Sequence, residues 1–234
     1  MPPFEVPEAL RERLIARRGR LHAYDRYEPT TTALVVVDMQ NFFMQEGEPM
    51  ASAAARDIVP NVNRLAHAVR EAGGRVIWIQ MEASEESITQ WRNFHELFRT
   101  EGREYRLRSL SRQGEGHQLW QDLEIDPADE HVIKRRYSAM IQGGSDLESV
   151  LQGGAIQTVL ITGVATNVCC ESTARDAMMR GFRTIMVSDA NASFTEAEHE
   201  AALLNFITYF GDVQSTDEVL DILAESAEPT RVSG

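Results

Sequence analysis

The chain has 234 residues, of which 43% are hydrophobic and 25% charged, a composition typical of a globular protein with a sizeable core. Its formal net charge of −13 argues against nucleic acid and anionic membranes as partners. No apolar run is long enough to span a membrane, and the N-terminal stretch has no apolar signal core, so we expect a cytoplasmic protein.

The apolar pattern predicts strands and helices that alternate along the chain. In chain order we expect a strand at 32–39, a helix at 59–74, a strand at 75–81, a strand beginning at 131, a strand at 157–163, a helix at 171–181, a strand at 183–190, and helices at 196–211 and 215–223. Ser215 and Glu218 have the spacing of a capping box at the start of the last helix. This alternation predicts an α/β fold with a Rossmann-like parallel sheet and helices on both faces.

Two regions fall outside this pattern. Residues 1–30 are predicted to form a helical N-terminal arm, and residues 31–234 a single domain, because no linker, repeat or low-complexity tract divides the chain. Residues 83–128 are polar, with arginines interleaved among glutamates. Two interpretations of this stretch stay open: a solvated insertion, or a segment that covers a pocket or makes an oligomer contact.

Reactive side chains follow three of the predicted strands. In a parallel α/β sheet, ligands bind beyond the carboxyl ends of the strands. Asp38 closes the first strand, Lys134 lies on the third, and Cys169 comes just after the fourth. Asp38 alone could cap a turn, and Lys134 could be one of three solvated cations with Arg135 and Arg136. A lysine on an apolar strand needs an acidic partner, however, and Asp38 is the candidate.

The two cysteines of the chain are neighbours at the start of a predicted helix. Successive helical residues diverge by about 100°, which puts Cys170 in register with the apolar Ala174 and Ala177, and Cys169 with the polar Thr173. We therefore expect Cys170 to pack in the core and Cys169 to be an exposed thiol. The helix N-terminus is expected to lower the pKa of Cys169 and make it a nucleophile for acyl transfer.

Other catalytic and cofactor-binding signatures are missing from the sequence. It contains no Gly-x-Ser-x-Gly, no Walker loop and no complete Gly-x-Gly-x-x-Gly. The six histidines show no metal-ligand spacing, so we expect no metal and no cofactor. Because no Cys–His pair is suggested by spacing, Asp38 is the preferred general base.

Three stretches together resemble the isochorismatase-like cysteine hydrolases, over about residues 30 to 224. "VVVDMQNFF" is similar to the family's first-strand signature, "VIKRRYSAM" to its lysine strand and "TGVATNVCCESTARDAMMRG" to its nucleophile loop. The resemblance implies a sheet of about six strands and an Asp38–Lys134–Cys169 triad. It also implies a cis peptide between Val164 and Ala165, which turns the backbone N–H groups of Ala165 and Cys169 toward the substrate oxygen.

Finer similarities indicate a branch of the family and a substrate class. "RYSAM", "ATNVCCEST" and "AALLNFITYFGDV" are most similar to ureidoacrylate amidohydrolases and related enzymes, although Met140 and Cys170 depart from the usual residues. The resemblance implies a cysteine-dependent amidohydrolase that cleaves a C–N bond of a small amide or ureido/carbamoyl compound through a thioester. Asn41, Phe43 and Tyr137 are the candidate substrate contacts.

Two other functions remain open from the sequence. One is an isochorismatase-type hydrolase that acts on a non-amide bond, and the other is a non-catalytic redox sensor that uses Cys169 and Cys170 as an oxidisable pair. The metal-binding Asp-x-His of the nicotinamidase branch is absent after the second strand. Because homo-oligomers are common in the family, we expect a homodimer or homotetramer with a small-molecule substrate.

Overall fold

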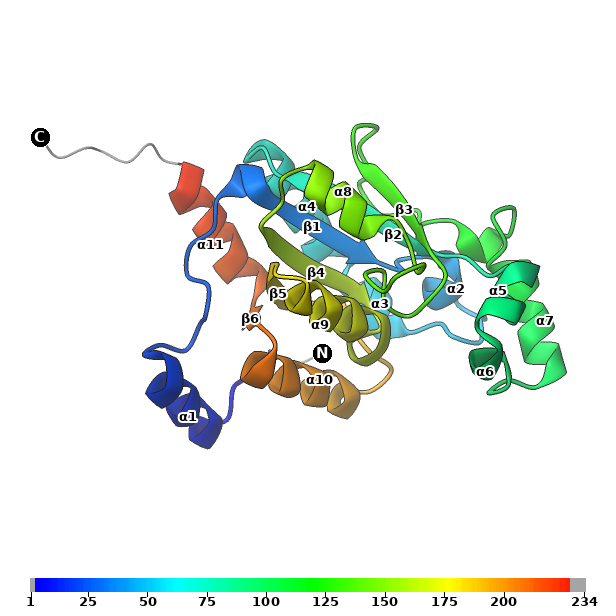
Figure 1. Cartoon of the computed structure of the whole chain (residues 1–234), viewed down its shortest axis with the longest axis horizontal. Helices are drawn as coiled ribbons and strands as arrows, with labels where there is room; N and C mark the ends of the chain where they lie inside the picture. The colour runs from blue at the N-terminus through cyan, green and yellow to red at the C-terminus, as the bar shows by residue number, and fades with distance from the viewer. Residues whose placement is uncertain (1–2, 228–234) are drawn as a thin grey trace, which may run out of the picture.

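The computed structural model describes residues 3–227, so residues 228–234 of the predicted domain and residues 1 and 2 of the predicted arm lie outside the described residues. Six strands form one parallel sheet in the order β3-β2-β1-β4-β5-β6, with helices on both faces (Figure 1). The strands are β1 (Thr32–Val37), β2 (Arg75–Met81), β3 (Glu130–Lys134), β4 (Thr158–Val164), β5 (Arg183–Ala192) and β6 (Asp212–Gln214). This architecture confirms the predicted Rossmann-like α/β fold.

Helices and short turns connect the strands. In chain order they are α1 (Glu8–Arg18), α2 (Asn41–Met44), α3 (Ala53–Asp57), α4 (Val59–Glu71), α5 (Glu85–Gln90), α6 (Arg92–His95), α7 (Thr100–Ser109), α8 (Leu147–Gly153), α9 (Glu171–Met179), α10 (Glu196–Tyr209) and α11 (Thr216–Ala227), with short turns η1 (Pro29–Thr31), η2 (Glu115–His117) and η3 (Thr166–Cys170). Helices α5, α6 and α7 lie together at the right of Figure 1, beyond the carboxyl end of β1. None of the described helices is long and apolar enough to cross a membrane.

The alternation of side chains along β1 divides the core into two halves. Val35 and Val37 face one side, where they pack in a cluster with residues of α8, α9 and α10. Leu34 and Val36 face the other side and pack with residues of α4 and α11. Every residue of β1 is buried, as expected for a central parallel strand that is covered on both faces.

Local sequence signals account for the ends of several helices. Pro60 lies in the first turn of α4, where its missing N–H costs no hydrogen bond. The predicted capping box of α11 is present, because Ser215 N donates to Glu218 Oε2 at 2.7 Å and Glu218 N donates to Ser215 Oγ at 3.3 Å. A second capping box joins Thr195 and Glu198 at the start of α10.

The structure departs from the predicted elements in several places. Strand β1 ends two residues earlier than predicted, because Asp38 adopts a left-handed backbone with φ of 53°. Strand β6 and helices α2, α3 and α8 were not predicted, since elements of three to seven residues carry little periodicity. Residues 83–128 contain three helices, α5 to α7, whose polar sequence hides the helical period.

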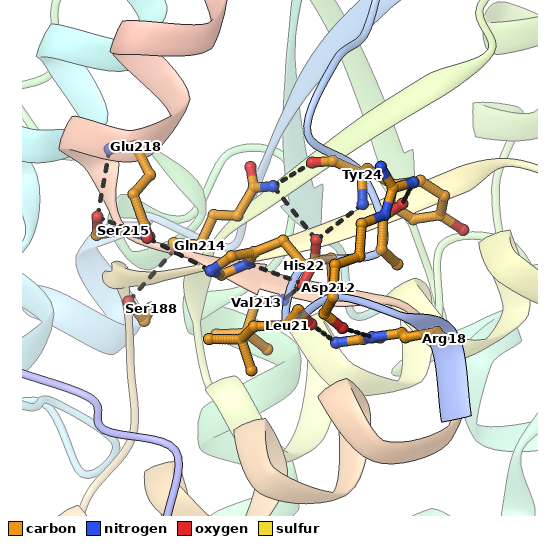
Figure 2. A network of polar contacts seen from close by, with 12 residues as sticks. Arg18, Leu21, His22, Tyr24, Ser188, Asp212, Val213, Gln214, Ser215 and Glu218 are labelled. Carbon is orange, nitrogen blue, oxygen red and sulfur yellow. Dashed lines mark hydrogen bonds and ion pairs between the residues drawn. The ribbon is translucent and has the colours of Figure 1, made fainter. Parts of the chain in front are cut away.

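The N-terminal segment is tied to the sheet edge by a buried carboxylate. Asp212 of β6 accepts hydrogen bonds from the backbone N of Tyr24 at 3.0 Å and from Gln214 Nε2 at 3.3 Å, and its other oxygen lies 3.2 Å from His22 Nδ1 (Figure 2). Arg17 of α1 donates to the carbonyl of Thr208 in α10 at 2.6 Å. The chain before β1 is therefore held against β6 and α10, while its separation from the domain as a distinct arm stays a prediction.

The pairing of His22 with Asp212 predicts a pH-dependent contribution to stability. The hydrogen bond to Asp212 is the largest of the effects that raise the pKa of His22; Glu218 adds to it, and burial and Arg18 oppose it. A raised pKa in the folded state gives stability below the unfolded value of about 6.5, and that stability is lost as the pH rises through the folded value. We expect His22→Gln to lower the free energy of unfolding by about 1.5 kcal/mol near pH 5.5, and by much less near pH 8.5.

Denaturant titration at the two pH values measures this difference. The matched control is His67→Gln, because His67 also faces a carboxylate, Glu71 at 3.3 Å, but both side chains are mostly exposed. The control should cost under about 0.5 kcal/mol at either pH. An equal loss for His22→Gln at both pH values would show that its charge contributes nothing to folding.

Candidate active site

Three strand ends bring the predicted reactive side chains to one place. Asp38 follows β1 directly, and its backbone N donates to the carbonyl of Ile79 in β2 at 3.0 Å. Lys134 is the last residue of β3, and Cys169 lies in η3, the turn after β4. The side chains of Asp38 and Lys134 are fully buried, and Cys169 is 7% exposed.

The ammonium of Lys134 is the centre of this cluster. Its Nζ lies 2.8 Å from Asp38 Oδ2 and 3.3 Å from Cys169 Sγ, and it also donates to the carbonyl of Arg136 at 3.1 Å. Asp38 Oδ1 is buried. The carboxylate contacts the lysine through Oδ2, and the thiol of Cys169 is its other hydrogen-bond partner.

Burial and the charges of neighbouring groups together set the pKa values of Asp38, Lys134 and Cys169. Burial raises the pKa of Asp38, against the opposing charge of Lys134. Burial by itself would lower the pKa of Lys134, but Asp38 and Cys169 outweigh that effect and leave the pKa above its ordinary value. Burial raises the pKa of Cys169 to about 12, although Lys134 acts to lower it. The resting cluster is therefore a protonated lysine beside a neutral thiol and a carboxylate of increased basicity.

The prediction of an exposed, acidic thiol at position 169 is wrong. The α-helix begins only at Glu171, and residues 166–170 form one turn of π-helix, so the α-helical register used to assign the two cysteines does not apply. Both cysteines are buried and free, and the loss of solvent around Cys169 raises its pKa. Cys170 packs in the core as predicted, with its sulfur 3.8 Å from the carbonyl of Thr162.

A mostly apolar cavity opens onto Cys169. Its wall consists of Phe43, Met50, Ser52, Ala55, Met81, Phe98, Arg106, Tyr137, Val164, Ala165, Val168, Cys169, Ala192, Ser193 and Phe194. Two of the three predicted substrate contacts, Phe43 and Tyr137, belong to this wall. The third, Asn41, does not: its Nδ2 donates to the carbonyl of Glu115 at 3.1 Å. The structure thus gives Asn41 a contact with η2 and not a place at the cavity.

Residues 83–128 contribute to the cavity wall. This agrees with the sequence interpretation in which the segment covers a pocket. Arg106 of α7 and Phe98, which precedes that helix, both line the cavity. Sequence reasoning did not select either residue, because Arg106 is one of several arginines in a polar stretch and no spacing distinguishes it. The segment is therefore more than a solvated insertion.

The loop that carries Cys169 is anchored on both sides. The peptide between Val164 and Ala165 is cis, which confirms that prediction, and Ala165 lines the cavity. Thr166 Oγ1 lies 2.8 Å from His199 Nδ1 of α10, and Ser193 Oγ donates to the side chain of Asn167 at 2.8 Å. Burial lowers the pKa of His199 to about 4, so this anchor is a neutral hydrogen bond.

A second anchor, which sequence reasoning missed, fixes the ends of β1 and β2. The buried side chain of Gln40 accepts from the backbone N of Met81 at 2.7 Å and donates to the carbonyls of Met81 and His117 at 3.1 and 2.9 Å. The amide therefore joins the strand end beside Asp38 to the strand end beside Lys134. Its only sequence signal is its position two residues after Asp38.

Comparisons with known proteins agree on a family. A family model described as the isochorismatase domain matches residues 32–218. A curated relative from Pseudomonas syringae pv. syringae (strain B728a), named ureidoacrylate amidohydrolase RutB, is 33% identical over 219 residues, which cover 88% of this chain and 89% of that protein.

Solved structures agree with this grouping. A cysteine hydrolase from Pseudomonas syringae pv. phaseolicola 1448A has a TM-score of 0.73 and 26% identity, covering 86% of this chain and 97% of its own. The N-carbamoylsarcosine amidase from Thermoplasma acidophilum has a TM-score of 0.64 and 25% identity, covering 80% of this chain and 97% of its own.

The close approach of β1 and β4 beneath the cluster predicts the effect of one substitution. Gly163 has φ of 109°, and a Cβ there would lie 2.1 Å from the carbonyl oxygen of Val37, the residue before Asp38. We expect Gly163→Ala to lower the free energy of unfolding by about 3 kcal/mol, from backbone strain and the clash together. Denaturant titration measures the loss.

The matched control separates the clash from the strain. Gly181 also has a positive φ, 94°, but a Cβ there meets nothing within 4 Å. Gly181→Ala should cost only the conformational strain, about 1 kcal/mol. If the two variants lost the same stability, the contact between Gly163 and Val37 would not be a steric constraint.

Proposed function

The chain belongs to the isochorismatase family, and from that membership we propose that it is a cysteine-dependent amidohydrolase acting on small ureido or carbamoyl compounds. The observation that carries the proposal is the contact of one buried ammonium with both a carboxylate and a thiol, Lys134 with Asp38 at 2.8 Å and with Cys169 at 3.3 Å, beside a cavity. The names of the relatives support the substrate class: a ureidoacrylate amidohydrolase and an N-carbamoylsarcosine amidase.

In the first half of the reaction, Cys169 is the nucleophile. Asp38 takes the thiol proton as the sulfur attacks the amide or ureido carbonyl, because the raised pKa of the carboxylate makes it a stronger base. The Sγ–C bond forms, and the carbonyl electron pair moves to the oxygen. The backbone N–H groups of Ala165 and Cys169 hold this oxyanion, a contribution of roughly 3–4 kcal/mol per donor in comparable sites.

In the second half, Asp38 returns the proton. It protonates the departing nitrogen, the C–N bond breaks, and ammonia or an amine leaves behind a thioester on Cys169. Asp38 then takes a proton from water, which attacks the thioester and releases the acid while the thiol regains its proton. Lys134 stays charged throughout and holds Asp38 and Cys169 in position. Phe43 and Tyr137 contact the substrate from the cavity wall.

The burial of both thiols weighs against a redox sensor. Sensor cysteines are accessible thiolates, whereas Cys169 is 7% exposed, Cys170 is fully buried, and burial raises the pKa of both. A redox-sensing function would also not explain the buried contact between Asp38 and Lys134.

Location and assembly complete the proposal. We place the enzyme in the cytoplasm, since its two cysteines are free and its composition is acidic. We also propose that the enzyme forms a homodimer or homotetramer, as its family membership suggests. Light scattering after size-exclusion chromatography measures the state directly.

Substitutions of Cys169, Asp38 and Cys170 test the roles assigned to the nucleophile and the base. We expect Cys169→Ala to reduce ammonia release from ureido acids by at least about 1000-fold with the fold intact, because the nucleophile is lost. Asp38→Asn should cause a loss of similar size, since the amide cannot carry the proton. The matched control is Cys170→Ala, the same change one residue away, which should keep turnover within about threefold.

The readout is ammonia release from ureido acids and primary amides, with circular dichroism to verify folding. Turnover by Cys169→Ala that equals the wild-type rate would remove covalent catalysis from the account. A wild-type enzyme that cleaves a vinyl ether but none of the amides would instead favour the hydrolase of a non-amide bond.

A further inference from the structure

Helix α7 places a buried arginine in the wall of the catalytic cavity. Arg106 is 7% exposed, whereas its neighbour Arg108 on the same helix is exposed to solvent. Arg106 lines the cavity together with Cys169 and Tyr137. Both Asp38 and Cys169 act electrostatically on its guanidinium, so it belongs to the same electrostatic environment as the reactive cluster.

Three aromatic rings hold the guanidinium in place. Its central carbon lies 5.1 Å from the ring centre of Phe42, 5.3 Å from that of Phe94 and 5.0 Å from that of Phe98. Cation–π contacts of this length fix the direction of the side chain, but ring faces do not neutralise a full charge. Arg106 is therefore preorganised and still electrostatically uncompensated.

Arg106 has no anionic partner in the described part of the chain. No carboxylate among residues 3–227 lies within ion-pair distance of it, its side chain donates no hydrogen bond there, and its Nε is fully buried without a partner. Arg112 and Arg135, by contrast, both have Glu82 as a partner, at 2.7 and 2.6 Å. The nearby Asp38 is already engaged by Lys134.

A buried unpaired charge is costly, and proteins pair such groups or leave them for a ligand. With Asp38 matched by Lys134 and the thiol neutral, Arg106 leaves the cavity with an excess positive charge. A planar guanidinium presents two parallel N–H donors, which match the two oxygens of a carboxylate. The missing partner has the chemistry of a carboxylate on the substrate.

We propose that Arg106 binds a carboxylate of the substrate, so that the enzyme selects ureido or carbamoyl acids over neutral amides. The proposal rests on the proposed hydrolysis at Cys169 and adds the substrate's charge and the residue that recognises it. Cys169 reacts with the carbonyl at one part of the cavity while Arg106 holds the acid group at another. Selectivity then comes from the unpaired arginine, which a neutral substrate leaves without a partner.

A paired-substrate experiment tests this assignment. Ureidoacetate and its methyl ester differ in charge but present the same ureido group. We expect Arg106→Gln to lower kcat/KM for ureidoacetate by about 100-fold, chiefly through KM, and to change kcat/KM for the ester by less than about threefold. Arg106→Lys keeps the positive charge but loses the two parallel N–H donors. Its kcat/KM for ureidoacetate should lie between those of Arg106→Gln and wild type.

The matched control is Arg108→Gln, the same substitution on the same helix. Arg108 is exposed and lies over Tyr105 at 5.4 Å, away from the cavity wall, so the variant should keep wild-type selectivity. Equal losses for acid and ester in Arg106→Gln would overturn the proposal, because they would mean that Arg106 acts on the thiol or the fold and not on the substrate's charge.

A second readout does not depend on turnover. Iodoacetate and iodoacetamide alkylate the same thiol, but only iodoacetate carries a carboxylate. Peptide mass spectrometry reports the rate at Cys169 for each reagent. We expect Arg106→Gln to slow the iodoacetate reaction by about tenfold relative to iodoacetamide. An unchanged ratio would contradict the carboxylate site, whereas a changed ratio without ureido hydrolysis would keep the site and reject the proposed function.

Discussion

The site depends on the buried contact between Lys134 and Asp38. Two opposite charges are fully removed from water at the ends of β3 and β1, which are separated in the sheet by β2. Burying such a pair gives little net stability, because desolvation offsets the attraction, but leaving either partner alone is strongly unfavourable. The pair is therefore better explained by chemistry than by folding: it holds an ammonium and a basic carboxylate against the sulfur of Cys169 without solvent.

The same desolvation defines how the thiol is used. Burial raises the pKa of Cys169 to about 12, so the thiol is neutral in the resting enzyme and is oxidised slowly. Its nucleophilicity appears only when the neighbouring carboxylate removes the proton during attack. Since burial raises the pKa of Asp38 as well, the proton moves between two groups that share one environment. The cavity adds a third element, the unpaired Arg106, which gives the site an affinity for anions that the cluster itself does not have.

The sequence predicted the elements that have a regular apolar pattern and the reactive residues that lie at strand ends. The apolar runs placed five strands, and the residues at their ends identified Asp38, Lys134 and the cysteine pair. It did not predict the burial of Cys169, because the turn at 166–170 is a π-helix and an α-helical register does not apply to it. Arg106 was missed because its partners Phe42, Phe94 and Phe98 come together only in the fold. Asn41 was a candidate substrate contact, yet its side chain donates to the carbonyl of Glu115.

The anchors around the cluster explain why distant segments matter to one sulfur atom. Gln40 joins the ends of β1 and β2, and His199 of α10 holds the turn that carries Cys169.

Detection of an acyl group on Cys169 tests the central claim most directly. Wild-type enzyme is mixed with a ureido acid, quenched rapidly with acid and analysed by peptide mass spectrometry. The account predicts a mass increase equal to the acyl group on the peptide containing Cys169, and none in Cys169→Ala. Turnover with an unmodified Cys169 at every quench time, or an acyl group on another residue, would contradict it.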